Sequence, residues 1–223
     1  MATGTRPARR VPPAAIPEHM TRFQFIISMF VLALVASVAS ASTSIPVART
    51  AGMKIDHVVG PKAEHPLDRP DGSVVVVIFG SIDCPVANAV VPEIRRIHRQ
   101  VEAGGGKVLF VHPTPGQAKK KMASHATDRK LEMSVLHDPR HELVGLLGAK
   151  VTPEAFVLLR KGEEWRVVYR GPVDNLYADV GRRRRNATKF HVREAVTAAF
   201  AGLPVEQSVR RPIGCFIERG AGK

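Results

Sequence analysis

The sequence predicts an α/β domain in which helices cover both faces of a central sheet. The run "VVVVIF" at 74–79 is apolar without alternation, which predicts a strand buried on both faces. Strand-like runs then alternate with stretches of helical apolar spacing, in the order β-α-β-α-β-α-β-β-α. The 223 residues leave room for one such domain with a proper core, and not for two.

The first helix is predicted from Pro85 to Ala103, where apolar residues recur at helical spacing. Three glycines at 104–106 end it, and Pro92 should kink it. The last helix lies in "NATKFHVREAVTAAFAG", with Asn186 as a candidate N-cap. The remaining predicted elements are the strands "KVLFVHP" and "SVLHD", a basic helix over 115–130, the helix "PRHELVGLLGA", and the hairpin strands "EAFVLLR" and "WRVVYRG" around the turn "KGEE".

The chain begins with a segment that predicts export. An apolar stretch at 23–41 follows Arg22 and ends in small residues, Ala39-Ser40-Ala41, as a signal peptide does before its cleavage site. The stretch is also nearly long enough to serve as a membrane anchor. The predicted organisation is a signal peptide or anchor at 1–41, a linker at 42–55, one domain at 56–203, and a tail at 204–223 that carries Cys215.

The net charge of +13 does not predict a nucleic-acid-binding protein. Basic residues are spread over the whole chain, and the aromatic content of 5% offers no stacking platform for bases. A basic surface also suits an anionic membrane or an acidic partner. The segment "GRRRR" at 181–185 is interpreted as a solvated loop that could contact such a surface.

The chain has two cysteines, and Cys84 lies directly between a buried strand and a helix. A thiolate at a helix N-terminus is stabilised by free N–H groups, so the pKa of Cys84 should fall below that of a free thiol. The alternative is that Cys84 is a small buried hydrophobe. Five further candidates, His98, His112, His125, His137 and His141, show no metal-ligand spacing and are interpreted as surface or strand-end residues.

Several motifs resemble the exported thioredoxin-like redoxins of the TlpA/ResA-like and AhpC/TSA-like group. They are "DCPVAN" with Cys84-Pro85, "VTPEAFVL" with Thr152-Pro153, "VVYRGPVDN" and the late "GC" at Cys215. The resemblance covers residues 56–217 and implies a thioredoxin-like fold with a central mixed sheet flanked by helices. It also implies that Pro153 is a cis-proline that faces Cys84, and that Pro85, Thr152 and Pro153 bind an extended substrate strand.

The sequence departs from these families at positions that matter for chemistry. Ala87 replaces the second cysteine of a Cys-x-x-Cys motif, so the usual resolving thiol is absent. Ser81 fits a peroxiredoxin, but Val77 replaces its proline, and Thr152-Pro153 stand where its arginine would be. Asn88 replaces the second cysteine of a copper chaperone.

The sequence therefore predicts an exported thiol–disulfide oxidoreductase with Cys84 as nucleophile and Cys215 as a possible resolving thiol. A redox-inert binding or assembly module, and more remotely a thiol peroxidase, are the alternatives. The expected partners are protein thiols or disulfides, or an external thiol reductant, with no cofactor, no metal and no nucleic acid.

The first prediction concerns export. Cleavage after the small-residue end of the apolar stretch should give a mature N-terminus near Ser42. The intact mass of protein recovered from the cell envelope measures this. A mass that retains residues 20–41 means an anchor, and recovery from the cytosol contradicts export altogether.

Overall fold

The computed structural model describes residues 43–60, 67–206 and 208–218. All of them lie in one unit, Ser42–Lys223. The predicted signal peptide or anchor, 1–41, lies outside the described residues. No helix among the described residues is long and apolar enough to cross a membrane.

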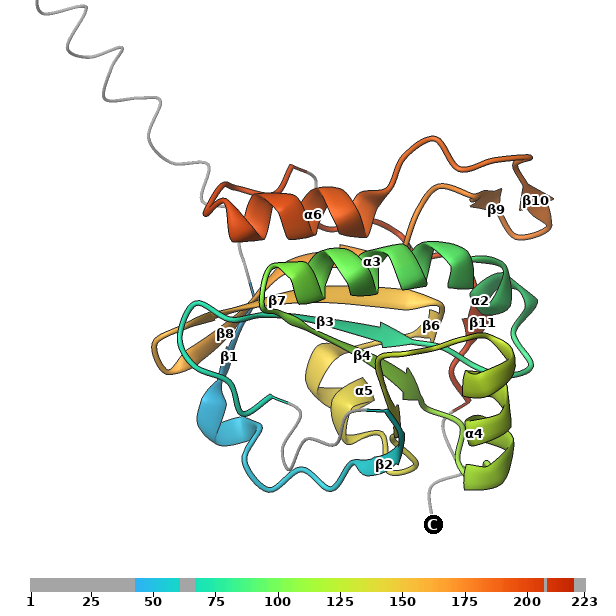
Figure 1. Ribbon diagram of the computed structural model, residues 1–223, viewed down its shortest axis with the longest axis horizontal. Helices are drawn as coiled ribbons and strands as arrows, with labels where there is room; N and C mark the ends of the chain where they lie inside the picture. Colours follow the sequence, from blue (N-terminus) through green and yellow to red (C-terminus); the bar gives the residue numbers. More distant parts are fainter. Residues whose placement is uncertain (1–42, 61–66, 207, 219–223) are drawn as a thin grey trace, which may run out of the picture. The chain divides into compact units, whose positions relative to one another are not determined.

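A seven-stranded mixed sheet runs through the domain in the order β1-β8-β7-β3-β4-β5-β2 (Figure 1). The inner strands β3, β4 and β5 are parallel to one another, and the remaining pairs are antiparallel. Its strands are β1 (Thr43–Pro46), β2 (Asp56–Val59), β3 (Val74–Phe79), β4 (Lys107–His112), β5 (Ser134–His137), β7 (Glu154–Lys161) and β8 (Glu164–Gly171). Two small sheets pair β9 (Tyr177–Asp179) with β10 (Arg182–Arg183) and β6 (Val151–Thr152) with β11 (Cys215–Phe216).

Strand β3 is buried on both faces because helices cover both faces of the sheet. Its side chains alternate between two apolar cores, with Val76 and Ile78 in one and Val75 and Val77 in the other. Helices α3 (Val91–Ala103) and α6 (His191–Phe200) supply the first core, and α5 (Glu142–Leu147) supplies the second (Figure 1). Helix α4 (Lys119–Asp128) follows β4. The predicted α/β class with a central mixed sheet is confirmed.

The first predicted helix is divided into two. Helix α2 (Pro85–Ala89) ends before Val90, and α3 begins at Val91. Pro92 therefore lies in the first turn of a new helix, where its missing N–H leaves no hydrogen bond broken. The proline produces a break where the sequence predicted a kink.

The last helix begins later than predicted, at His191, so Asn186 is not its N-cap. The side-chain oxygen of Asn175 accepts hydrogen bonds from the backbone N–H groups of Thr188 and Lys189, at 2.8 and 3.0 Å. The side chain of Asn175 thus binds the N–H groups that Asn186 would have capped.

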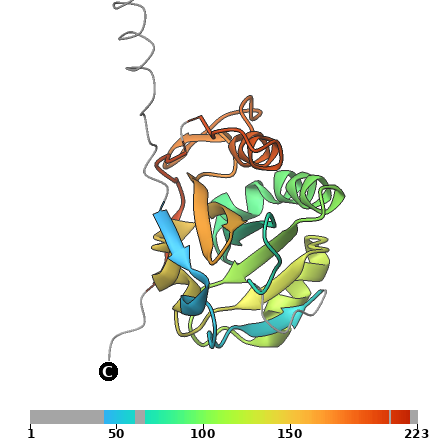
Figure 2. The same ribbon diagram turned by 90° about the vertical axis from the view of Figure 1, so that its left-hand side faces the viewer.

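Two segments predicted to lie outside the domain contribute to it. Residues 43–46, within the predicted linker, form β1 at the edge of the main sheet, where Ile45 pairs with Trp165 and is buried (Figure 2). A short 3-10 helix, η1 (Val47–Arg49), follows. The described part of the predicted tail adds strand β11 beside β6 (Figure 1).

The core on the α3 side should tolerate truncation poorly. Ile94 is fully buried there, so Ile94→Ala should lower the free energy of unfolding by about 3 kcal/mol through lost burial and a residual cavity. Urea unfolding followed by circular dichroism measures it. Val180→Ala, at a residue 77% exposed, is the matched control; its effect should stay within about 0.5 kcal/mol. Equal losses from both variants would contradict the assignment of this core.

Candidate active site around Cys84

Cys84 lies in the loop that leaves the end of β3 and is the N-cap of α2. Its Sγ accepts a hydrogen bond from the backbone N–H of Ala87 at 3.4 Å, and Pro85 occupies the first turn of the helix. The side chain is buried, with 1% of its surface exposed. The helix is only five residues long, so the local N–H group of Ala87, rather than a long helix dipole, is what can act on the sulfur.

Asn88 and His125 hold this loop in place, and sequence reasoning missed both. The side-chain amide of Asn88 donates to the backbone oxygens of Ile82 at 2.7 Å and Cys84 at 3.1 Å. Its oxygen lies 2.8 Å from Nε2 of His125 on α4. Burial, together with the charge of Arg129, lowers the pKa of His125, which favours a neutral ring that donates to Asn88. The sequence did contain one signal for this role: Asn88 lies one helical turn after Cys84, where its side-chain amide can reach back to the cysteine loop.

The histidines are more buried than the sequence predicted. His98 on α3 and His125 on α4 are buried helix residues, so their interpretation as surface residues is wrong. His112 and His137 do lie at strand ends, but they are buried as well. Burial and the neighbouring His125 and His137 lower the pKa of His112 to about 3, so this ring is neutral at physiological pH.

The Thr152-Pro153 peptide is cis, as predicted, and lies against Cys84. The thiol of Cys84 donates a hydrogen bond to the backbone oxygen of Thr152 at 2.9 Å. Thr152 itself is buried and belongs to the short strand β6. The structure thus brings Cys84 and Thr152 together, although they are far apart in the sequence.

A buried carboxylate positions β6. Glu154 is fully buried and accepts hydrogen bonds from the backbone N–H groups of Lys150 at 2.7 Å and Val151 at 3.4 Å. Its other oxygen forms an ion pair with Arg170 at 2.9 Å. The Arg170 guanidinium also donates a hydrogen bond to the backbone oxygen of Gly148 at 3.0 Å, so it connects the end of α5 to Glu154.

The tail strand β11 brings the second cysteine to the first. It pairs antiparallel with β6 so that Cys215 is opposite Thr152 and Phe216 is opposite Val151. The Sγ atoms of Cys215 and Cys84 lie 2.7 Å apart, and both thiols are free. Cys215 is partly exposed, whereas Cys84 is covered.

Gly214 permits this approach. A Cβ atom added at position 214 would overlap the Thr152 carbonyl oxygen and lie 2.6 Å from its carbon. These are main-chain atoms, which cannot rotate away. The role of Gly214 is thus to allow the close contact of two backbones.

The tail is also attached upstream of Gly214, at the end of β8. The backbone N–H of Arg170 donates to the oxygen of Ser208 at 2.8 Å, and the N–H of Arg210 donates to the oxygen of Arg170 at 3.0 Å. Downstream, the N–H of Ile217 donates to the oxygen of Lys150 at 3.0 Å. The described tail is therefore docked along the domain.

The two thiols have opposite pKa shifts. Burial raises the pKa of Cys84, but hydrogen bonds to its sulfur from the Cys215 side chain, the Ala87 backbone and the Thr152 side chain outweigh it and leave the pKa below its ordinary value. Burial and the proximity of Cys84 raise the pKa of Cys215 to about 11. Cys84 is thus the group that ionises first, and the S–H of Cys215 stabilises the resulting thiolate.

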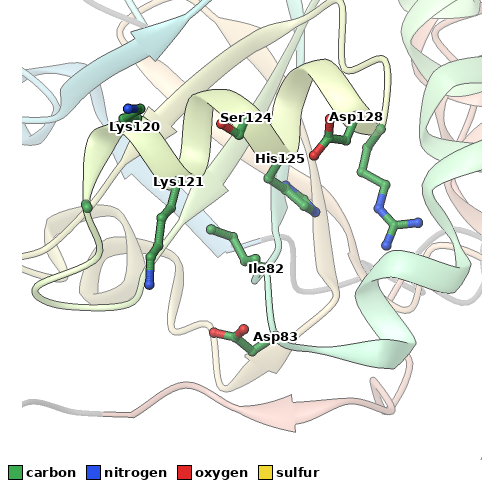
Figure 3. Close-up of a pocket in the computed structure, with 9 residues that line it drawn as sticks. Ile82, Asp83, Lys120, Lys121, Ser124, His125 and Asp128 are labelled. Carbon is green, nitrogen blue, oxygen red and sulfur yellow. The ribbon is translucent and has the colours of Figure 1, made fainter.

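Two cavities adjoin the loop before Cys84 and share Asp83. The smaller one, about 220 Å³, is lined by Cys84, Thr152 and Cys215 together with residues of β11 and the loop after β4. Pro85 is exposed and, like Pro153, does not line it. The larger one, about 900 Å³, lies between α4 and the loop, where Lys120, Lys121 and Asp128 face the same space as Asp83 (Figure 3).

The domain is therefore thioredoxin-like, with a cysteine between the first inner strand and a helix, opposite a cis-proline. In comparisons with known proteins, the model of the AhpC/TSA family matches residues 62–168. This match confirms the predicted resemblance to the redoxins. A comparison with curated proteins found no match to the sequence.

Two solved structures share the fold. An uncharacterized conserved protein from Geobacillus kaustophilus is 20% identical, with 76% of this chain and 89% of that chain covered and a TM-score of 0.64. A hypothetical protein from Sinorhizobium meliloti is 22% identical, with 68% and 82% covered and a TM-score of 0.59. At this level of identity the two structures support the fold and nothing about activity.

The coupling between the thiols gives a prediction. Replacement Cys215→Ala removes the S–H that stabilises the Cys84 thiolate, so the pKa of Cys84 should rise, whereas Cys215→Ser keeps a donor and should raise it less. The pH profile of alkylation by iodoacetamide measures the pKa independently of the absolute rate. In the matched variant Cys84→Ala, the pKa of Cys215 should fall from about 11. An unchanged Cys84 profile in Cys215→Ala would contradict the coupling.

Proposed function

We propose that the protein is an exported thiol–disulfide oxidoreductase in which Cys84 is the nucleophile and Cys215 the resolving thiol. The observation that carries the proposal is the contact between the two free sulfur atoms, with Cys84 shifted toward the thiolate and Cys215 toward the thiol. The match to the AhpC/TSA family supports cysteine redox chemistry in general.

The reaction proceeds by two exchanges. The Cys84 thiolate attacks one sulfur of a substrate disulfide, so that a Cys84–substrate disulfide forms and the other substrate sulfur leaves as a thiolate. Cys215 then attacks the Cys84 sulfur, and its proton passes to the substrate sulfur that leaves. The substrate is reduced by two electrons, and the protein holds a Cys84–Cys215 disulfide. Two molecules of an external thiol reductant, oxidised to their own disulfide, restore both thiols.

Thr152 and Pro153 are proposed to bind the substrate as an extended strand, and Pro85 to shape the cysteine loop. The pairing of β11 with β6 supports this role, because the edge of β6 that β11 occupies accepts an antiparallel strand. The exposed arginines at 182–185 would suit an anionic membrane surface or an acidic partner. The sequence pattern supports the proposed export to the periplasm or cell envelope, with residues 1–41 as a cleaved signal peptide or residues 23–41 as an anchor.

The peroxidase alternative is weaker. A peroxidase needs a cation to stabilise the hydroxide that leaves when the thiolate attacks a peroxide. The described residues that line the Cys84 cavity include no arginine and no lysine. A redox-inert module remains the principal alternative, and it requires that Cys84 never exchanges with a substrate.

Mixed-disulfide trapping distinguishes these functions. With Cys215→Ser the second exchange is blocked, so Cys84 should accumulate as a disulfide with its substrate, whereas Cys84→Ser should trap nothing. Insulin reduction with a thiol reductant should fall to the uncatalysed rate in both variants. If neither trapping nor insulin reduction occurs, the redox-inert module is the better description. Peroxide consumption above that of Cys84→Ser would favour the peroxidase.

Oxidation of the wild-type chain tests the role of Cys215. Mild oxidation should convert the two adjacent thiols into one intrachain disulfide, which non-reducing peptide mapping detects as a linked pair of peptides. Two free thiols, or intermolecular dimers alone, would remove Cys215 from the mechanism and make Cys84 dependent on an outside thiol.

A further inference from the structure

The tail occupies the position that a substrate strand needs. Strand β11 takes the edge of β6, and with the tail in place only 1% of the Cys84 surface is exposed. Under the proposed function, a substrate must therefore replace the tail before Cys84 can attack it. The contacts of the tail then show what each position of a substrate segment would meet.

The position before the cysteine accepts only glycine. A Cβ at position 214 would overlap main-chain atoms of Thr152 and lie 3.0 Å from the nitrogen of Pro153. A substrate strand in the same register would bring its own backbone equally close to Thr152. Any side chain there would have to push the strand, and with it the reacting sulfur, away from Cys84.

The two positions after the cysteine differ from each other. Phe216 borders a cavity of about 190 Å³ but is 85% exposed, so this position should carry little selection. Ile217 is half-buried and lines the same cavity with Val144, Ala149 and Lys150. Its backbone N–H is also bonded to Lys150, which directs the side chain of this position toward the apolar core under α5.

We propose that the cleft selects extended segments of the form glycine–cysteine–any residue–apolar residue, and that the chain's own tail is an intramolecular copy of such a substrate. The proposal rests on the proposed function and names its substrate class. The docked tail competes with the substrate and covers Cys84 when no substrate is bound.

Peptides with the sequence of residues 213–218, Ile-Gly-Cys-Phe-Ile-Glu, test the selection. Each carries its cysteine as a mixed disulfide with thionitrobenzoate, and the protein is the full chain with Cys215→Ser. The Cys84 thiolate attacks the peptide sulfur, a Cys84–peptide disulfide forms, and thionitrobenzoate leaves as a coloured thiolate. The rate of its release is measured at peptide concentrations below saturation.

Alanine in place of the peptide glycine should lower the rate by about tenfold or more, because the clash is with backbone. Asparagine in place of the peptide isoleucine should also lower it by about tenfold, since its uncharged amide cannot pair with the charge of Lys150 and would face the apolar core under α5. Alanine in place of phenylalanine is the matched control at the exposed position and should change the rate by no more than about twofold. Equal rates for all four peptides would overturn the proposal.

The same clash can be built into the tail. The double variant Gly214→Ala, Cys215→Ser should dock its tail less well and react faster with the wild-type peptide than Cys215→Ser alone does. An equal or slower rate, with unchanged circular dichroism, would overturn the competition between tail and substrate.

The symmetrical disulfide of thionitrobenzoate distinguishes failure of the proposed selection from failure of the proposed function. Reaction of Cys84 with this small reagent but with none of the peptides overturns the selection and leaves the proposed function standing. No reaction with either overturns both.

Discussion

The ion pair between Glu154 and Arg170 is the constraint on which the site depends. Glu154 is fully buried, and among the described residues Arg170 and two backbone N–H groups balance its carboxylate. Removal of Arg170, whose side chain is 31% exposed, would leave the charge of the buried Glu154 uncompensated and would destabilise the fold. The segment 150–152 is therefore fixed relative to β8, and the backbone oxygen of Thr152 is held where the Cys84 thiol meets it.

Arg170 extends this constraint to the tail. Its side chain holds Glu154, while its backbone N–H and C=O bond Ser208 and Arg210. Arg170 thus fixes the position of Thr152 through Glu154, and it also fixes the position of the tail at Ser208 and Arg210. The position of Cys215 over Cys84 follows from these two attachments together with the close contact at Gly214.

Local patterns in the sequence were enough to predict the strand Val74–Phe79 and the place of Cys84 between that strand and a helix, because each has a signature within a few residues. The cis-proline at 153 was implied by the resemblance to the redoxins. The features that were missed join distant parts of the chain. Asn88 meets His125, and Glu154 meets Arg170, through side-chain geometry that exists only after folding. Cys215 in the tail was predicted as a possible resolving thiol, but the register of the tail on β6 depends on backbone hydrogen bonds that no pattern of residue types encodes.

The attachment of the tail reconciles the burial of Cys84 with its chemistry. A thiolate poised for exchange must be protected from oxidants and yet reach a large substrate. The tail is bound by a two-residue strand and a few backbone hydrogen bonds, and its side chains are half-buried or exposed. Segments with so little buried apolar surface open at a lower free energy than the core does. Under the proposed function the tail would therefore leave while the sheet and the ion pair stay intact, and β6 would then present its edge, with Thr152 still beside Cys84, to an incoming strand.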